Sequence, residues 1–323
     1  MRSSIPWERG QLARKKPQIL CLMGPTATGK TQLALELVQK LPCDIISVDS
    51  AMVYRGMDIG TAKPTPAEQA LAPHRLIDIA DPAESYSAGR FYQDAVREIE
   101  AILACGRIPL LVGGTMLYFR ALQQGLSEIP AADPKIREEL ANQAIEEGWP
   151  SLHAELNRVD PASAAAISPN DGQRIQRALE IYAITGQPRT AWFKDQSKPP
   201  YQCINIGLWV EDRVQLQSRV QNRLKAMFKA GFIEEVQRLH QRGDLHADLP
   251  ALRAVGYQQI WQAVNTGQIH LPNLLNSVTI STMQLAKRQM TWLRRWNNLA
   301  QFDCFSGQLS AEILQFLRRA IKI

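Results

Sequence analysis

The sequence lacks long apolar segments and paired cysteines. No apolar run approaches the ~18 residues that a helix needs to span a bilayer, so we expect no membrane association. None of the cysteines forms a C-x-x-C pair, and their number is odd, which favours a reducing compartment and argues against a zinc site. These cysteines are Cys21, Cys43, Cys105, Cys203 and Cys304.

The N-terminal stretch also lacks the features of a targeting segment. Residues 1–16 are polar and basic and contain no apolar core of a signal peptide, so we interpret them as a loose leader. The chain has no internal repeat and no low-complexity segment beyond Ala162–Ala166. Together these absences predict a cytoplasmic protein.

The overall composition is typical of a soluble globular protein. The 323 residues are 45% hydrophobic and 21% charged, enough for one large domain or a core domain with an insertion. The net charge is +6 and the pI about 9.1. This modest basic bias is compatible with a nucleic-acid partner but does not by itself indicate one.

One segment matches the phosphate-loop pattern G-x-x-x-x-G-K-[ST] at every fixed position. A strand-like run, 18–23, precedes it, and a segment of helical composition, 32–38, follows it, which is the context that the motif requires. The segment consists of Gly24, Pro25, Thr26, Ala27, Thr28, Gly29, Lys30 and Thr31. A chance match in a glycine turn is the alternative.

The residue types of this segment predict a polyphosphate site. Backbone N–H groups and a helix N-terminus would surround phosphate oxygens, Lys30 would reach the outer phosphate, and the Thr31 hydroxyl would hold Mg²⁺. The pattern identifies neither the polyphosphate nor its reaction.

A second strand, predicted over 43–48, ends at Asp49 and completes a βαβ unit with parallel strands. Ligands of such sheets bind beyond the carboxyl ends of the strands, which places Asp49 beside the phosphate loop. A carboxylate there suits a Mg²⁺ ligand, a general base or a loop cap, and the pattern leaves all three open.

A helix is predicted over 88–105 and a further strand over 108–112. Gly113 and Gly114 at the end of that strand would permit close approach of the backbone to a ligand. Thr115 is expected either to direct its hydroxyl toward the same crevice or to cap the next helix, and both roles are compatible.

Strand-like runs disappear over 127–200, where helices are predicted over 134–147, 151–157 and 172–185. This block is typical of a helical insertion into an α/β core. Polar residues off the apolar stripe of the last helix, and basic residues interleaved with aromatic ones, suit either unpaired RNA bases or a solvated helix face. They are Gln173, Arg174, Arg177, Arg189, Trp192, Lys194, Lys198 and Tyr201.

The remaining chain returns to a strand over 202–210, followed by helices over 212–229, 233–241 and 280–293, the last of them strongly basic. Either Arg219 or Arg223 could clamp phosphate oxygens. The loop 54–64 is rich in glycine and polar residues and indicates a functional loop near the site.

Seven blocks of this sequence resemble the tRNA dimethylallyltransferase family and follow the order of that family over about residues 18–296. They are Gly24–Thr31, Asp49–Ala51, Tyr54–Pro64, Gly113–Tyr118, Asn170–Glu180, Val255–Gln258 and Ala286–Arg294. The resemblance implies transfer of a dimethylallyl group from its diphosphate to N6 of adenosine 37, in tRNAs that read codons beginning with U.

The resemblance also implies an α/β fold, with a P-loop NTPase-like parallel sheet core, an α-helical insertion domain and a helical C-terminal part. We expect residues 17–126 and 201–323 to form the catalytic core. Residues 127–200 would form the insertion that binds the anticodon stem-loop, and the protein would act as a monomer.

By resemblance, Asp49 is the general base, Thr115 orients the amine or bridges to the diphosphate, and Arg223 joins Lys30 and Mg²⁺ in neutralising the leaving group. Residues expected to contact tRNA are Asp49, Ser50, Ala51, Met52, Thr115, Arg137, Gln173, Arg174, Ile175, Gln176, Arg177, Arg253, Ala254, Val255, Gly256, Tyr257 and Gln258.

The sequence departs from the family pattern at a residue expected near the target base, and it lacks an extension that some relatives have. Met52 stands where many members have Gln, which changes the side chain available to the target base. The zinc-finger extension of eukaryotic relatives is missing, which suggests a bacterial form. Without the resemblance, a small-molecule kinase that uses ATP, or a nucleotide-gated RNA-binding protein, would explain the same loop.

Overall fold

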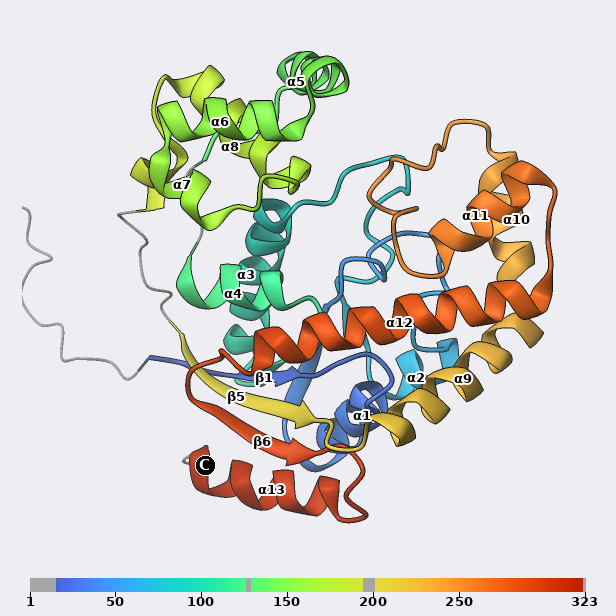
Figure 1. Ribbon diagram of the computed structural model, residues 1–323. Helices are drawn as coiled ribbons and strands as arrows, with labels where there is room; N and C mark the ends of the chain where they lie inside the picture. Colours follow the sequence, from blue (N-terminus) through green and yellow to red (C-terminus); the bar gives the residue numbers. More distant parts are fainter. Residues whose placement is uncertain (1–15, 126–128, 194–200, 322–323) are drawn as a thin grey trace, which may run out of the picture. The chain divides into compact units, whose positions relative to one another are not determined.

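The computed structural model describes residues 16–125, 129–193 and 201–321 (Figure 1). The predicted leader, apart from Lys16, lies outside the described residues, as do Lys194 and Lys198. The chain divides into two compact units, one made of residues 1–123 and 200–323 and the other of residues 124–199.

A six-stranded sheet forms the centre of the larger unit. The strands are β1 (Gln18–Met23), β2 (Cys43–Val48), β3 (His74–Arg75), β4 (Ile108–Gly113), β5 (Gln202–Trp209) and β6 (Leu299–Asp303). Their order is β3-β2-β4-β1-β5-β6, and every neighbouring pair is parallel. The carboxyl ends of β2, β4 and β1 therefore lie side by side, at the edge where such sheets bind ligands.

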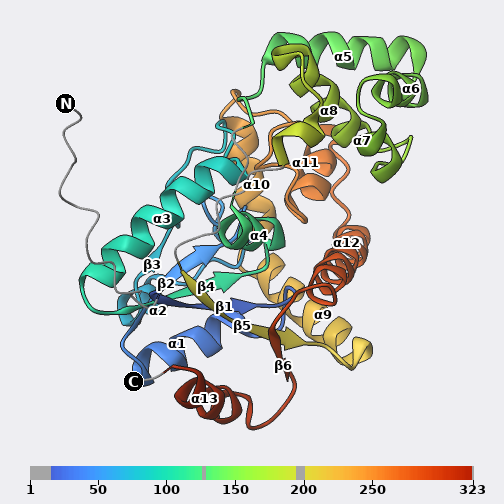
Figure 2. The same cartoon turned by 90° about the vertical axis from the view of Figure 1, so that its left-hand side faces the viewer.

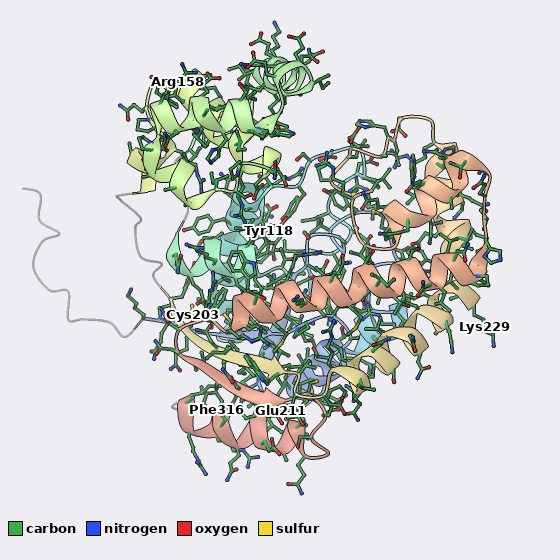
Figure 3. The ribbon with its side chains drawn as sticks, in the orientation of Figure 1. Tyr118, Arg158, Cys203, Glu211, Lys229 and Phe316 are labelled. Atoms are coloured by element: carbon green, nitrogen blue, oxygen red, sulfur yellow. The ribbon has the colours of Figure 1, made fainter. Side chains whose placement is uncertain are left out.

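Helices cover both faces of this sheet (Figure 2). On one face are α1 (Lys30–Lys40) and α13 (Leu309–Ala320). Phe316 of α13 packs edge-on against Phe302 of β6, with ring centroids 5.7 Å apart (Figure 3). A short helix, α2 (Pro66–Leu71), precedes β3.

The other face carries the larger apolar core. It is covered by α3 (Ala88–Ala104), α4 (Met116–Gln124), α9 (Arg213–Lys229), α10 (Phe232–Gln241), α11 (Tyr257–Thr266) and α12 (Leu271–Leu293). In α3 the buried residues are the predicted stripe, Phe91, Ala95, Ile99 and Ile102. Tyr118 of α4 stacks on Phe91 at 4.3 Å between ring centroids (Figure 3).

The smaller unit is helical. It contains α5 (Pro134–Glu147), α6 (Trp149–Val159), α7 (Pro161–Ala166), α8 (Gly172–Thr185) and a 3₁₀ helix, η2 (Arg189–Phe193). Asp171 caps α8, since its side chain accepts the N–H of Arg174. The helices pack around a small core that includes Leu152, Leu156 and Ile175.

The predicted α/β class, the parallel core and the helical character of the insertion are confirmed. The C-terminal part differs from the prediction: α12 begins at Leu271 rather than Ile280, and α11, β6 and α13 were not predicted. The first turns of α12 hold Asn, Ser, Val and Thr residues of modest helix propensity, so burial of Leu274 and Val278 stabilises them instead. Among the described residues, no helix is both long and apolar enough to span a bilayer.

Candidate active site

The loop between β1 and α1 has the conformation that phosphate binding requires. Ala27 and Gly29 have φ of 63° and 84°, so the backbone turns through two left-handed residues before the helix starts. The Thr28 hydroxyl is buried and donates to the carbonyl oxygen of Pro25 at 2.8 Å. Gly24 is required by packing, because a Cβ there would lie 2.9 Å from Cβ of Leu208.

The N-terminus of α1 carries no acidic side chain in its first turn and no side-chain cap. Its free N–H groups, together with the turns at residues 27 and 29, therefore form an anion-binding concavity. Residues Thr26–Thr31 line a cavity of about 880 Å³, whereas Gly24 and Pro25 are buried and do not line it.

Asp49 lies on the same cavity, directly after β2. Its Oδ1 accepts the N–H groups of Ala51 at 2.9 Å and Met52 at 3.3 Å, so the carboxylate caps its own turn. Among the described residues, none donates a hydrogen bond to Oδ2. The cap and a chemical role are therefore compatible, because they use different oxygens.

Thr115 follows β4 and is also on the cavity wall. Its Oγ1 accepts the N–H of Ser50 at 3.0 Å and lies 3.3 Å from Oγ of Ser50. Its own N–H donates to the carbonyl oxygen of Val48 at 3.2 Å. Thr115 is thus held against the turn that carries Asp49.

The two glycines before Thr115 line the cavity, and each also lies close to other protein atoms. A Cβ on Gly113 would lie 2.0 Å from the carbonyl oxygen of Val48, so the glycine allows β4 and β2 to approach closely. A Cβ on Gly114 would lie 2.4 Å from Nε2 of Gln289.

Gln289 of α12 is a site residue that the sequence analysis did not single out. Its side chain is 8% exposed, its Oε1 accepts the N–H of Thr26 at 2.9 Å, and its Nε2 donates to the carbonyl oxygen of Gly114 at 2.9 Å. One amide therefore joins the phosphate loop to the turn that carries Thr115. The only signal in the sequence is its place in the block Ala286–Arg294.

Two cationic side chains, Lys30 of the phosphate loop and Arg223, line this cavity. Arg223 of α9 lines the cavity, whereas Arg219 donates to the carbonyl oxygen of Cys304 and lies over the ring of Phe305, 4.4 Å from its centroid. Burial, assisted by Arg223 and opposed by Asp49, lowers the pKa of Lys30 to about 8. Burial also lowers the pKa of Arg223, again against the attraction of Asp49.

The side chains that line this cavity include more basic than acidic groups. Both cations are partly removed from water, and Asp49 is the carboxylate that offsets each of them. Lys30 turns back to the carbonyl oxygen of Pro25 at 2.5 Å. A multiply charged anion such as a diphosphate would satisfy this set of groups, because buried charges require partners.

The donor set fits a magnesium ion only together with an anionic ligand. Thr31 and Asp49 supply hard oxygen atoms on the same cavity, which suits Mg²⁺. Within the described residues, no group of three or more His, Cys, Asp or Glu could hold a metal ion alone. Magnesium usually takes one or two protein ligands and completes its shell with substrate phosphates and water.

The predicted acceptor-side residues of the larger unit have different surroundings. Ala51, Met52, Arg253, Ala254, Val255 and Tyr257 line the cavity, and so does Ser50. Gly256 has φ of 93° and packs against Phe232, and Gln258 is exposed but does not line the cavity. Tyr257 is fully buried, with its hydroxyl on Glu235, which makes its side chain a structural group.

Among the residues of the helical unit that were predicted to contact RNA, only some have exposed side chains. Gln173 and Arg174 are exposed, and Arg174 lies 3.4 Å from the Asp171 carboxylate. Ile175 is fully buried in the core of the unit and cannot offer its side chain to RNA. Gln176 donates to the carbonyl oxygen of Arg137 at 2.8 Å.

Arg137 and Arg177 share the buried carboxylate of Glu180, at 2.8 Å and 2.5 Å. Arg177 also donates to the carbonyl oxygen of Pro130 at 2.6 Å, so it does not face only solvent or a ligand as expected. Burial acts against ionisation of Glu180, but the hydrogen bonds from both arginines keep its pKa below the ordinary value. The carboxylate fixes the two guanidinium groups.

Comparisons with known proteins show the family to which this chain is related. The family model described as IPP transferase matches residues 52–296, and that described as isopentenyl transferase matches residues 17–78. The tRNA dimethylallyltransferase of Coxiella burnetii (strain Dugway 5J108-111) is 51% identical over 306 residues, which cover 94% of this chain and 98% of the relative. That of Thioalkalivibrio sulfidiphilus is 55% identical over 282 residues, which cover 87% and 88%.

Solved structures agree with the sequence relatives. The tRNA isopentenylpyrophosphate transferase of Bacillus halodurans is similar with a TM-score of 0.68 and 37% identity, over 94% of this chain and 96% of that chain. A eukaryotic dimethylallyltransferase acting on tRNA shares the fold, with a TM-score of 0.76 and 24% identity, over 94% and 79%. With a family model over most of its length and relatives at half identity, this chain belongs to the IPP transferase family of tRNA dimethylallyltransferases.

Proposed function

We propose that this enzyme transfers a dimethylallyl group from dimethylallyl diphosphate to N6 of adenosine 37 in tRNAs that read codons beginning with U. The observation that carries the proposal is the shared cavity. A phosphate loop, two partly buried cations and a carboxylate whose Oδ2 accepts no hydrogen bond from the described residues line it together.

The phosphate loop binds a leaving group in this reaction and transfers no phosphoryl group. The bond between the allylic carbon and the diphosphate oxygen breaks, and negative charge develops on that oxygen. The N–H groups of the loop, Lys30 and Arg223 lie on the same cavity and stabilise this charge. Mg²⁺ held by Thr31, when bound, would add positive charge against the same phosphates.

The acceptor nitrogen needs a base because its lone pair is delocalised into the adenine ring. As the bond from N6 to carbon forms, Oδ2 of Asp49 takes a proton from N6, while Oδ1 continues to cap the turn. Thr115, fixed by the N–H of Ser50, orients the amine or bridges to the diphosphate. Adenosine 37 lies in a loop of the tRNA, so turning it out of the stack costs only a few kcal/mol.

We assign residues 17–126 and 201–323 to catalysis and residues 127–200 to binding of the anticodon stem-loop. Arg137, Gln173, Arg174 and Arg177 supply positive and hydrogen-bonding groups in the helical unit, and Arg253–Gln258 supply such groups in the catalytic core. The enzyme acts as a monomer in the cytoplasm, where its tRNA substrate is found.

Incubation of the purified protein with tRNA and dimethylallyl diphosphate labelled in its isopentenyl carbons tests the proposal. Label should be retained on tRNA, and digestion followed by mass spectrometry should give N6-(dimethylallyl)adenosine. The tRNA of a deletion strain should lack that nucleoside. Consumption of ATP with a small acceptor would instead identify a kinase, and tRNA binding without modification would identify a non-enzymatic RNA-binding protein.

The depressed pKa of Lys30 predicts a pH dependence. Below about pH 8 Lys30 is cationic and binds diphosphate, and above it the free enzyme loses this charge. We expect kcat/KM for dimethylallyl diphosphate to fall as the pH rises through about 8, because kcat/KM follows the ionisation of the free enzyme. In Lys30→Arg the fall of kcat/KM near pH 8 should disappear. If the fall is unchanged in that variant, it must be caused by the ionisation of another group.

Arg174→Ala is expected to weaken tRNA binding and to reduce the slope of log K against log salt by about one. The side chain is 64% exposed, so the substitution removes a charge without opening the core. Filter binding over a range of salt concentrations measures both effects. The matched control is Arg158→Ala, which removes the same charge from α6 of the same unit at a residue that is not expected to contact tRNA. Equal slopes of log K against log salt in the two variants would contradict the assignment.

A further inference from the structure

Glu235, in the first turn of α10, is a buried carboxylate that neither the motifs nor the proposed chemistry uses. It is 2% exposed and belongs to the apolar stripe of the helix that includes Phe232, Val236 and Leu239. Its Oε2 accepts the N–H groups of Asp58 at 3.0 Å and Ile59 at 2.8 Å. Its Oε1 accepts the N–H of Gly60 at 3.2 Å and the hydroxyl of Tyr257 at 2.5 Å.

Three of these partners fix the loop 54–64. Three successive N–H groups that converge on one carboxylate define the backbone path over 58–60. The path leads directly into Gly60–Pro64, which lines the cavity. A Cβ on Gly60 would lie 2.0 Å from the ring of Phe232 and 2.6 Å from that of Tyr257, so the loop is pressed against the same two residues.

The fourth partner belongs to a different cavity wall. Tyr257 starts α11, and Gly256 alone separates it from Arg253–Val255, which line the cavity. Its ring meets that of Phe232 edge-on, with centroids 5.0 Å apart. Burial and the neighbouring Glu235 raise the pKa of the Tyr257 hydroxyl, which therefore stays protonated and able to donate.

We infer that Glu235 is a positioning residue that holds the 58–64 loop and the 253–257 segment in one arrangement and thereby sets the tRNA side of the cavity. This inference rests on the proposed function, which assigns 253–258 to flanking bases of the tRNA. The residues proposed to bind diphosphate, Thr26–Thr31 and Arg223, make none of the four hydrogen bonds to Glu235. Glu235 therefore affects binding of the acceptor tRNA and not binding of the leaving group.

Only an anion at residue 235 satisfies this junction, because all four partners are donors. In Glu235→Gln one oxygen becomes an NH₂ group that faces two donors. If it lies at the Oε1 position, the Tyr257 oxygen can still accept, but the N–H of Gly60 is left without a partner. Glu235→Asp keeps the charge on a shorter side chain and should restore part of the lost function.

The decisive variant is Tyr257→Phe, because it removes one hydroxyl and leaves the ring and the carboxylate in place. The matched control is Tyr201→Phe. Tyr201 is only 7% exposed, so it cannot stack on RNA bases as the sequence allowed, and its hydroxyl is buried without a hydrogen-bond partner among the described residues. With dimethylallyl diphosphate saturating, Tyr257→Phe should raise KM for tRNA about 3- to 30-fold, a fraction of what a hydrogen bond to a charged group is worth. The kcat and the KM for dimethylallyl diphosphate should change by less than about twofold.

Hydrogen exchange of the full-length protein without substrates supplies a readout independent of activity. Amides of residues 58–60 should exchange faster in Tyr257→Phe than in wild type or Tyr201→Phe, by about tenfold. Glu235→Gln should increase both effects and Glu235→Asp should reverse part of the increase. If Glu235→Gln does not fold, Tyr257→Phe still carries the test.

The outcomes separate the two proposals. Failure of the wild type to prenylate tRNA would reject the proposed function, while the exchange of residues 58–60 would still show whether Tyr257 and Glu235 fix the loop. Normal prenylation with the same KM for tRNA and the same exchange in Tyr257→Phe and Tyr201→Phe would overturn the positioning role alone.

Discussion

Asp49→Asn is expected to lower the single-turnover rate of prenyl transfer about 10²- to 10⁴-fold, the range for loss of a general base. The amide keeps an oxygen that can accept the N–H groups of Ala51 and Met52. It cannot accept the proton of N6, because a neutral amide does not act as a base near neutral pH. Affinity for tRNA should be nearly unchanged. Rapid quench with labelled dimethylallyl diphosphate and excess enzyme measures the rate, and filter binding measures the affinity.

Asp49→Ala separates the two functions of this carboxylate. It removes both the base and the cap of the turn, whereas Asp49→Asn removes only the base. We expect the two variants to be similarly slow, because the chemical role dominates. A near-wild-type rate in Asp49→Asn with a slow Asp49→Ala would leave Asp49 as a cap of the turn and reject it as the base.

Arg223→Ala should lower kcat/KM for dimethylallyl diphosphate about 10²- to 10³-fold, the usual effect of removing one donor to a developing anion in a preorganised site. Arg223 lines the cavity beside Lys30, and its loss leaves the leaving-group charge with fewer partners. The pH limb assigned to Lys30 should also move upward, since Arg223 is one of the groups that lower the pKa of Lys30.

Arg219 offers a control on the same helix. Its guanidinium lies over Phe305 and donates to the carbonyl oxygen of Cys304, away from the cavity lining. Arg219→Ala should therefore leave kcat/KM near the wild-type value. A larger loss in Arg219→Ala than in Arg223→Ala would reverse the assignment of the clamp, which the sequence alone left open.

Much of the core was predictable because its signals are local. Five apolar residues before the loop, the glycine spacing and the helical composition after it define β1, the turn and α1 within a few residues of chain. The same holds for β2, β4 and α3, where the run of apolar residues or the stripe reports burial directly. The convergence of Asp49, Thr115 and the phosphate loop then follows from parallel strands, because their carboxyl ends share one edge.

The errors concern residues whose environment is made by distant chain segments. Ile175 belongs to a motif block expected to contact tRNA, yet its side chain is fully buried in the core of the helical unit. Strand β6 has partly exposed residues and no clear alternation, so only its pairing with β5 identifies it as a strand. Helix α12 extends back to Leu271 because the core accepts Leu274 and Val278.

By itself, the sequence determined the phosphate loop, the order of strands and helices around it, and the carboxylate at the end of β2. These features depend on the types of residues and their spacing over short stretches of the chain. The tertiary structure decided which arginine of α9 meets the cavity, and that Gln289 and Glu235 join segments far apart in the chain. A buried amide or carboxylate must find its hydrogen-bond partners wherever the fold brings them, and no local pattern records that choice.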